Sequence, residues 1–434
     1  MGNSPREKLQ ARKDRFEKLV TDGKIDEYTA EAIRELLNAY DENNVMVTKP
    51  KGESHRTPQT LMAWLYRLMV FAQYRDLTEA AADDINQDVQ EMHSGEYPHV
   101  QDKGLKKGTL RAYQAAIRKF YGYHDYGVDP NDIPLFDKEE TSVDPNDMLT
   151  KEEIHEARDV IDNPRDLLIY DLLIYTGQRR EALRTLRIKD VSPQEGTFRL
   201  NPEVEGLKGA SDRNGNRPLL AAKATVQDWI NNYHPEPSDP ENYLITARTG
   251  YSAVDPTTPV SGETIRKVME NIKKETDITK PMHPHAMRHN FVTIAKRDYD
   301  IPDDTIKYLI GHDADSTVME STYAHLSGDD HVQRAEEAFG IREPEEESSF
   351  TPDVCRVCNN PLEPSAKACS NCGTVYTPDA QQAREQVEKD MKRSYGETDP
   401  EDEDTMDKID ALDGLLEDPE VRKALLEKID DQSH

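Results

Sequence analysis

Three histidines and an arginine stand within seven positions in the stretch HPHAMRH, residues 283–289. Pro284 can open a helix, and His285, Arg288 and His289 would then share one helix face. A metal site, an anion site and a structural polar cluster are the three readings of such a stretch. The central arginine would repel a cation, whereas its planar fork matches phosphate oxygens, and histidine can donate or shuttle a proton. The stretch therefore favours an anion site.

Other stretches supply companions for this site. YTGQRREALRTLRIKDV places Arg179 directly after a Thr-Gly pair, where we expect a helix junction. Lys208 lies in a strand-like segment beside Asn214–Gly215, which is a hairpin signal. LIGHDADSTVMESTYAHLS contains His312 and, eleven residues later, Tyr323.

Together these stretches resemble the tyrosine recombinase (phage integrase) family. The family pattern is Arg in a TGxR box, Lys in a β-hairpin, HxxR, GH and then Tyr, and all five occur in that order over about 150–330. Each box alone is weakly specific, but the ordered set is strongly specific. Residues 57–125 also resemble the helical core-binding domain of the family, at the level of pattern only.

The resemblance implies strand transfer on DNA by a tyrosine nucleophile. A tyrosine hydroxyl has a pKa near 10, so it needs a base and a phosphate whose charge has been neutralised. Arg179 and Arg288 would bind the non-bridging oxygens of the scissile phosphate and stabilise the transition state. Tyr323 would become a 3′-phosphotyrosine. That bond stores the energy for rejoining, so neither ATP nor a metal is required at the active site.

The resemblance assigns the remaining proton transfers and contacts as well. His285 would take or return the proton of the nucleophile, Lys208 would protonate the departing 5′-oxygen, and His312 would donate to the phosphate. Arg213 and Arg217 lie in the same hairpin and are alternatives to Lys208.

Two positions depart from the family pattern, and two histidines have no catalytic assignment. Ala182 stands where the family often has an acid that helps to hold the arginine, with Glu181 one residue earlier. Gln178 replaces a residue that is usually apolar. We expect His283 and His289 to be structural neighbours of the site.

All four cysteines fall in CRVCNNPLEPSAKACSNC, as two CxxC pairs that are ten residues apart. Two such knuckles can aim four thiolates at one tetrahedral zinc ion, with no position left for water, which predicts a structural zinc ribbon. Disulfides are the alternative, and a cytosolic chain disfavours them. Because so short a module buries little, zinc must supply its folding energy. The predicted ligands are Cys355, Cys358, Cys369 and Cys372.

The chain has a formal net charge of −30, with acid spread along its whole length. The plain reading is a protein that avoids nucleic acid, and the second reading, which we favour, is adaptation to multimolar salt. The Debye length is roughly 3 Å at about 1 M salt, so short-range contacts are then more informative than net charge. The segment 101–124 is locally basic, which indicates either phosphate contacts or a solvated helix face. The candidate DNA contacts are Lys103, Lys106, Lys107, Arg111, Arg118 and Lys119.

Helical periodicity dominates the chain, with strand signals only near 197–217. We therefore expect a mainly α fold with a small antiparallel β-sheet, which the resemblance extends to a clamp around duplex DNA. Helices are expected at about 5–21, 26–41, 150–190 and 261–276, and from Thr57–Pro58 and Thr109. The expected divisions are an N-terminal helical extension (1–50), a core-binding domain (51–135), a catalytic domain (146–342), a zinc ribbon (351–378) and an acidic tail (379–434).

The chain has no run of eighteen apolar residues and begins with a polar segment, so we expect a cytoplasmic protein. The resemblance implies integration or excision of a mobile element by a tetramer on paired DNA sites, with 329–341 docking on a neighbouring subunit. The ribbon or the tail could bind a protein partner. The alternatives are a type IB-like topoisomerase, a non-catalytic DNA-binding regulator and a metal-dependent nuclease. Spacing alone does not reveal the target sequence, because base readout depends on side-chain placement.

Overall fold

The computed structural model divides the chain into two compact units, each with its own hydrophobic core. The N-terminal unit is Asn3–Glu140, and the C-terminal unit is Thr141–His434 with Met1–Gly2. The residues that the structure describes are 5–44, 53–98, 100, 102–138, 144–201, 204, 207, 215–248, 254–299, 301–312, 351–362, 366–377, 380, 384 and 389.

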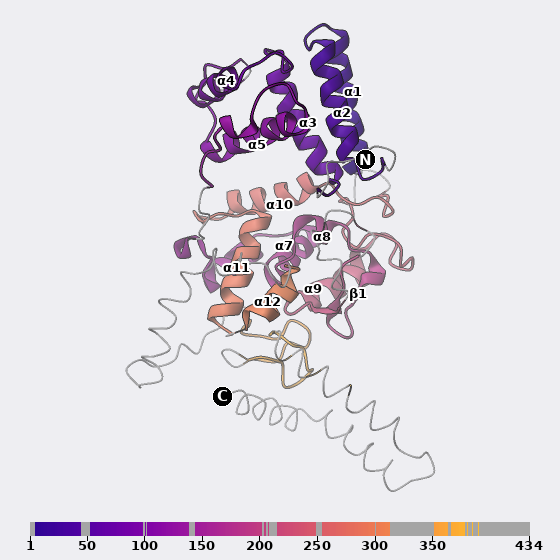
Figure 1. Ribbon diagram of the computed structural model, residues 1–434. Helices are drawn as coiled ribbons and strands as arrows, with labels where there is room; N and C mark the ends of the chain where they lie inside the picture. Colours follow the sequence, from indigo (N-terminus) through magenta and orange to yellow (C-terminus); the bar gives the residue numbers. More distant parts are fainter. Residues whose placement is uncertain are drawn as a thin grey trace. The chain divides into compact units, whose positions relative to one another are not determined.

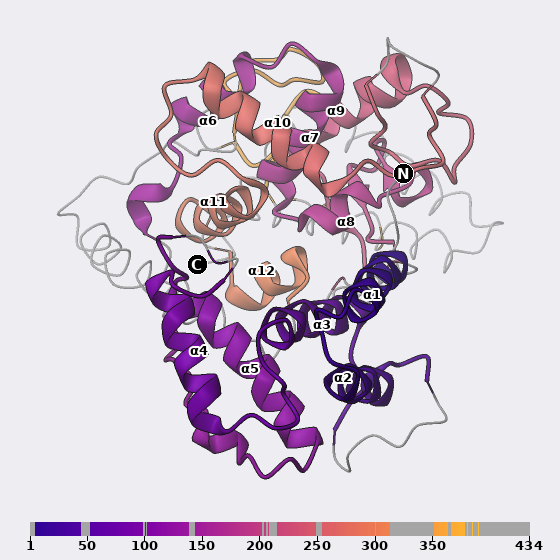
Figure 2. The ribbon, with the colours of Figure 1, turned by 90° about the horizontal axis from the view of Figure 1, so that it is seen from above.

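The N-terminal unit consists of helices gathered around α3 (Figure 2). Its elements are α1 (Pro5–Thr21), α2 (Glu27–Tyr40), α3 (Pro58–Ala72), α4 (Ala82–Ser94), α5 (Lys107–Tyr123) and η1 (Pro130–Asp132). α3 packs against α1, α2 and α5, and α4 packs against α5. The expected starts of α1, α2 and α3 are confirmed within one residue, and α5 begins two residues before Thr109. α4 is not among the helices expected from the sequence.

The core of the N-terminal unit runs across the expected boundary at residue 50. Phe16 of α1 and Leu36 of α2 are buried in the same cluster as Leu65 of α3 and Phe120 of α5. The helices over 5–40 therefore share one core with the helices over 58–123, because their apolar faces fill it together.

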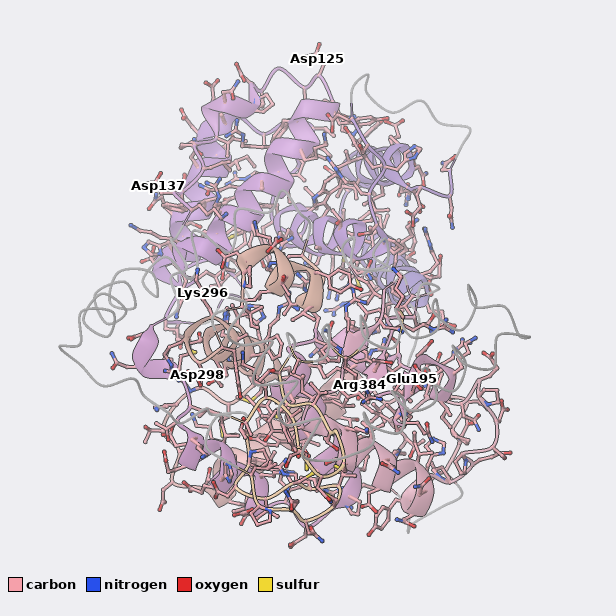
Figure 3. All side chains as sticks on the ribbon, turned by 90° about the horizontal axis from the view of Figure 1, so that it is seen from below. Asp125, Asp137, Glu195, Lys296, Asp298 and Arg384 are labelled. Atoms are coloured by element: carbon pink, nitrogen blue, oxygen red, sulfur yellow. The ribbon has the colours of Figure 1, made fainter. Side chains whose placement is uncertain are left out.

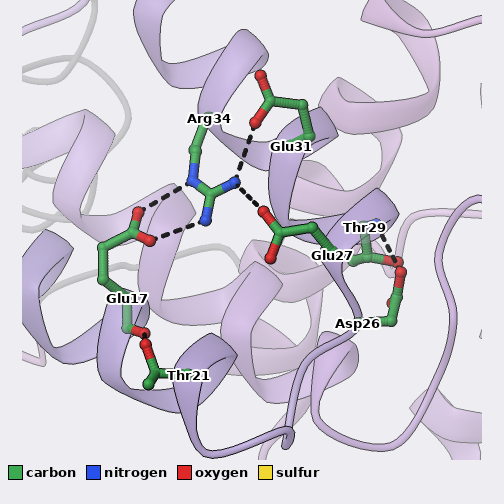
Figure 4. Close-up of polar contacts among 7 residues, drawn as sticks. All are labelled: Glu17, Thr21, Asp26, Glu27, Thr29, Glu31 and Arg34. Carbon is green, nitrogen blue, oxygen red and sulfur yellow. Dashed lines mark hydrogen bonds and ion pairs between the residues drawn. The ribbon is translucent and has the colours of Figure 1, made fainter.

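Arg34 joins α1 and α2 at the surface of this unit (Figure 4). Its Nε and Nη2 donate to Glu17 at 3.0 and 2.8 Å. Its Nη1 donates to Glu27 at 2.8 Å and to Glu31 at 2.9 Å. The hydrogen bond from Arg34 holds the pKa of Glu17 below its ordinary value. Exposed pairs contribute at most about 1 kcal/mol each, so the cluster orients the two helices more than it stabilises them.

The C-terminal unit is built on α7, whose residues are buried along almost its whole length. Figure 1 shows the place of α7 within this unit. Its helical elements are η2 (Pro145–Asp147), α6 (Lys151–Asp159), α7 (Pro164–Thr176), α8 (Arg180–Arg184), η3 (Ile188–Asp190), α9 (Ala222–Asp228), η5 (Trp229–Tyr233), α10 (Gly262–Glu275), α11 (Pro284–Arg297) and α12 (Asp303–Ile310). α7 consists mostly of apolar residues, which is typical of a helix in a core, and it contacts α9, α10 and α11. The helical region expected at 150–190 thus comprises α6, α7, α8 and η3.

Within the described residues of this unit, three short strands form an antiparallel sheet. They are β1 (Val191–Ser192), β2 (Thr197–Phe198) and β3 (Arg217–Pro218), in the order β1-β2-β3. Val191 pairs with Phe198, which pairs in turn with Arg217. The predicted fold class, mainly α with a small antiparallel sheet, is confirmed.

The cysteine module, which we define as residues 351–377, packs onto the core of the C-terminal unit. An antiparallel bridge closes each of its two knuckles, Val354 with Pro361 and Ala368 with Val375. Its buried cysteines belong to the same hydrophobic cluster as α7 and α11. The module thus shares a core with the expected catalytic domain.

The acidic residues expected on the surface include Asp125, Asp137 and Glu195, which are exposed and labelled in Figure 3. Among the helices that the structure describes, none has the length and apolar character needed to cross a bilayer.

We expect Phe16→Ala in the full chain to lower the free energy of unfolding of the N-terminal unit by about 3–5 kcal/mol, because it opens a cavity in the common core. Hydrogen exchange of the α3 amides measures this loss. Tyr28→Ala is the control, since Tyr28 on α2 is 81% exposed. Equal protection of α3 in the two variants would contradict a core that includes α1.

Candidate active site

Arg179 lies at the junction between α7 and α8. α7 ends at Thr176, and Gly177 caps it in the left-handed conformation with a φ of 60°. A side chain at Gly177 would overlap the ring of Phe291 on α11, so both the backbone and the packing require glycine. The chain then turns so that Arg179 Nη1 donates to the carbonyl of Gly311 at 3.0 Å. The expected helix junction is confirmed.

α11 begins within the HPHAMRH stretch, as expected, and carries Arg288 into the interior. His283 caps this helix, because its Nδ1 accepts from the backbone of Ala286 at 3.0 Å. Arg288 is 3% exposed, and its Nη1 donates to the carbonyls of Gly177 at 3.0 Å and Ile310 at 2.7 Å. His283 therefore has the structural role that we predicted, and Arg288 meets the Arg179 junction.

Four side chains converge on the end of α12. We define the α12 carbonyl end as the carbonyl groups of Leu309, Ile310 and Gly311. Arg288 and Arg179 bind its last two carbonyls, which are consecutive. Gln178 Nε2 and Arg217 Nε both bind its first carbonyl, at 2.7 and 3.2 Å. The last carbonyls of a helix carry partial negative charge, so this end favours cations. The carbonyls of Ile310 and Gly311, which are neighbours in the chain, each accept from one guanidinium.

Sequence reasoning did not find the roles of Gln178 and Arg217. Gln178 is 1% exposed and donates to the carbonyl of Thr176 at 2.9 Å as well as to that of Leu309. The glutamine, which stands where the family usually has an apolar residue, therefore adds a hydrogen bond between the α7–α8 junction and α12. Arg217 is 1% exposed, and its guanidinium lies over the ring of Tyr308 at 5.2 Å. Arg217 is thus a structural residue. In the sequence, these two roles are indicated only by the position of Gln178 and Arg217, which are polar residues next to strongly apolar runs.

His312 follows α12 and lies within the field of both guanidiniums. Its backbone N–H donates to the carbonyl of Lys307 at 2.8 Å. Its Nδ1 is buried and has no hydrogen-bond partner among the residues that the structure describes. Burial, and then the charges of Arg288 and Arg179, lower the pKa of His312 to about 3. A neutral ring with an unpaired nitrogen beside two cations is a suitable place for an anion.

His285 and His289 pack together on α11, with ring centroids 4.4 Å apart and planes at 72°. His285 is exposed, whereas His289 is partly buried beneath it. Burial, and then the charge of His285, lower the pKa of His289 to about 4. His289 thus supports His285, which is the ring that a substrate could reach.

Glu181 does not replace the acid that the family often has near the first arginine. Its Oε2 accepts from Arg184 Nε at 2.7 Å, and its Oε1 lies 3.7 Å from Arg180 Nε. Ala182 is buried. The carbonyl of Gly311 accepts from Arg179 instead.

Two predicted catalytic residues, Lys208 and Tyr323, lie outside the residues that the structure describes, as does the segment 329–341. Their roles stay predictions. The structure thus brings together Arg179, Arg288 and His312, and His285 lies one helical turn before Arg288 on α11.

The predicted DNA contacts on and before α5 separate into two groups. Lys103, Lys106 and Lys107 are exposed. The other three make contacts within the unit: Arg111 donates to the carbonyl of Phe136, Arg118 donates to Asn131 at 2.7 Å, and Lys119 pairs with Glu53. The exposed lysines at the start of α5 are therefore the better placed for phosphates.

The four predicted zinc ligands meet at one point. Their Sγ atoms all lie within 4.8 Å of one another. The distance is 3.6 Å between Cys355 and Cys372 and 3.6 Å between Cys358 and Cys369. A disulfide needs about 2.05 Å, whereas four sulfurs around zinc at about 2.3 Å would stand roughly 3.8 Å apart. The geometry fits a tetrahedral metal ion and does not fit disulfides.

We expect the stability of the C-terminal unit to fall as the pH decreases from about 6.5 towards 4. The unfolded state takes up a proton on His312 near pH 6.5, whereas the folded state resists it until about pH 3. His312→Asn should therefore show a smaller stability difference between pH 7.5 and pH 5 than the wild type. Urea unfolding at the two pH values measures this, and equal differences would contradict it.

The chain is similar to known recombinases over much of its length. Residues 147–329 match the Phage integrase family. Tyrosine recombinase XerC of Staphylococcus saprophyticus is 24% identical over 293 residues, which are 62% of this chain and 92% of that protein. Tyrosine recombinase XerA of Saccharolobus solfataricus is 23% identical over 261 residues, which are 59% of this chain and 78% of that protein.

Among solved structures, the Tn1549 transposon integrase in complex with transposon right end DNA is 17% identical and aligns with a TM-score of 0.47, over 71% of this chain and 99% of its own. The stretch matched to the family contains Arg179, Arg288 and His312 at the α12 carbonyl end, together with the position of Tyr323. Residues 147–329 are therefore a domain of the phage integrase family, the tyrosine recombinases.

Proposed function

We propose that this chain is a site-specific DNA recombinase that cuts and rejoins duplex DNA through a 3′-phosphotyrosine intermediate. The observation that carries the proposal is the pair of guanidiniums on consecutive carbonyls of α12. They lie beside a ring nitrogen of His312 that has no hydrogen-bond partner in the described part of the chain. The relatives named as recombinases support it.

In this proposal Arg179 and Arg288 bind the non-bridging oxygens of one scissile phosphate. A guanidinium has five N–H donors, so it can bind a carbonyl and a phosphate oxygen at once. The α12 carbonyl end fixes both groups before the substrate arrives, so little reorganisation is needed as charge develops on the phosphate. His312 donates a further hydrogen bond to the phosphate from its neutral ring.

The proposed reaction forms a bond between Tyr323 Oη and phosphorus and breaks the bond from phosphorus to the 5′-oxygen. His285, exposed at the start of α11, accepts the proton of the phenol. Lys208 gives a proton to the departing 5′-oxygen. In the second step a 5′-hydroxyl attacks the phosphotyrosine, the two protons return, and the strand is rejoined without ATP or a metal at this site.

We further propose that the four cysteines hold one structural zinc ion and that the enzyme acts as a tetramer on paired sites. The sulfur separations support the first proposal. The second rests on the resemblance, with 329–341 as the segment that docks on a neighbouring subunit. Lys103, Lys106 and Lys107 are the phosphate contacts that we favour in the N-terminal unit. Integration or excision of a mobile element, in the cytoplasm of a salt-adapted cell, is the corresponding biological role.

A nicked suicide substrate tests the function, because loss of a short strand traps the covalent intermediate. We expect wild type to form a protein–DNA adduct and Tyr323→Phe to form none while still binding the DNA. Tyr233→Phe is the control, since this tyrosine is 46% exposed in the same unit, and it should form the adduct normally. Binding without any wild-type adduct would support the regulator instead, and relaxation of plasmid lacking a special site would support the topoisomerase.

We expect Arg179→Ala to slow formation of the adduct by about 10²–10³-fold, as loss of one preorganised donor does in other enzymes. Single-turnover cleavage at saturating protein measures the rate. Arg180→Ala provides a matched control, because Arg180 is the next residue and its side chain is 43% exposed. Its rate should stay close to that of wild type. If both variants cleaved equally fast, Arg179 would have no role at the phosphate.

A further inference from the structure

The cysteine module inserts one arginine into the interior of the C-terminal unit. Arg356 lies between the ligand positions Cys355 and Cys358, and its side chain is 17% exposed. Its guanidinium lies over the ring of Tyr175 at 5.6 Å, and its Nη2 donates to the hydroxyl of Tyr175 at 3.3 Å. Its Nη1 lies 3.9 Å from a carboxylate oxygen of Asp171. The knuckle therefore reaches the middle of α7.

The receiving site on α7 is a buried charge cluster. Asp171 is 0% exposed. Arg158 of α6 binds it at 3.2 Å, and the hydroxyl of Thr225 on α9 donates to it. Arg356 is thus the second cation at a carboxylate that three helices enclose. A buried charge is costly unless it is paired, so each partner of Asp171 contributes to holding α6, α7 and α9 together.

Further contacts fix the module on the same face. Tyr299, which follows α11, lies with its hydroxyl 3.3 Å from the hydroxyl of Thr351. Lys151 at the start of α6 pairs with Asp353 at 3.4 Å. Cys355 and Cys369 are both 0% exposed and belong to the core cluster of the unit. The module is therefore a packed part of this unit.

The direction of Arg356 depends on the knuckle. Packing against the unit buries Cys355, and a metal bound through Cys355 and Cys358 would in addition fix the backbone on both sides of Arg356. Tyr175 is one residue before the end of α7, whose cap at Gly177 leads to Arg179. The metal site and the junction that presents Arg179 are thus linked through one arginine and one helix.

We infer that metal binding by the four cysteines is thermodynamically coupled to the folded state of α7 through Arg356. The metal-bound module stabilises the recombinase domain. Loss of the metal therefore favours local opening of α7 and of the junction between α7 and α8. The inference rests on the zinc site proposed above and is independent of the strand-transfer chemistry.

Thermodynamic coupling is reciprocal: if zinc binding stabilises α7, then a stable contact with α7 must strengthen zinc binding. The experiment therefore measures zinc affinity. If zinc stabilises α7 through Arg356, removal of the Arg356 side chain must weaken zinc binding, although this residue is not a ligand. We expect Arg356→Gln in the full chain to bind zinc about tenfold more weakly, within the range of couplings between protein sites. Competition with a chromophoric chelator measures the affinity. Cobalt absorption bands report whether four thiolates still bind the metal.

Val357→Ala is the matched control, because Val357 lies in the same knuckle and is 40% exposed. It should bind zinc as wild type does. Hydrogen exchange of the α7 amides supplies a second readout. Zinc removal should speed exchange in wild type and in Val357→Ala, and it should have a smaller effect in Arg356→Gln.

Equal zinc affinity in wild type and Arg356→Gln would overturn the coupling. So would hydrogen exchange of the α7 amides that stays the same when zinc is removed from wild type. If Arg356→Gln does not fold, Tyr175→Phe carries the test, because it removes only the hydroxyl and should weaken zinc binding about two- to threefold. A wild-type chain that binds neither zinc nor cobalt would overturn the coupling and the zinc site together. The adduct assay would still decide the strand-transfer proposal separately.

Discussion

Hydrogen bonds to the α12 carbonyl end hold together segments that lie far apart in the chain. Gln178 and Leu309 are 131 residues apart, and Arg179 and Gly311 are 132 residues apart. Two guanidiniums brought this close repel each other, and the partial negative charge of the helix end offsets that repulsion. The same carbonyls that complete the fold thus keep two cations poised for an anion. Without α12, Arg179 would lose its bond to the carbonyl of Gly311, and Arg288 would lose its bond to the carbonyl of Ile310.

Net charge is a poor guide to what this protein binds. The chain carries −30 overall, and acidic side chains such as Asp125 and Glu195 are exposed. The candidate site, in contrast, combines two arginines with histidines that burial keeps neutral. Because interactions beyond the Debye length are screened, the local arrangement decides whether a phosphate is attracted. An acidic surface and an anion site are therefore compatible in one molecule.

Short local motifs were sufficient to predict most of the helices and of the candidate site residues. Contacts between residues far apart in the sequence could not be predicted in this way. Arg179, Arg288 and His312 were identified because the TGxR, HxxR and GH boxes that contain them occur in the order of the family that the chain resembles. The carbonyl partner of Arg217 lies 92 residues away, and nothing near Arg217 in the sequence indicates it.

Periodicity likewise shows that a helix face is buried, but not against which partner. For this reason the expected boundary at residue 50 crosses the core that contains Phe16 and Leu65. The same limit applies to the cysteine module, whose spacing predicted a metal site. Its packing against α7 could be seen only in three dimensions.

The insertion of Arg356 also has a consequence for the order in which the protein can mature on the ribosome. Arg356 and Tyr175 are separated by 181 residues, a length that takes on the order of 10–40 s to synthesise at about 5–20 residues per second. During that time α7 is present without one of its buried partners. The buried carboxylate of Asp171 therefore lacks its second cation until the cysteine module has been synthesised.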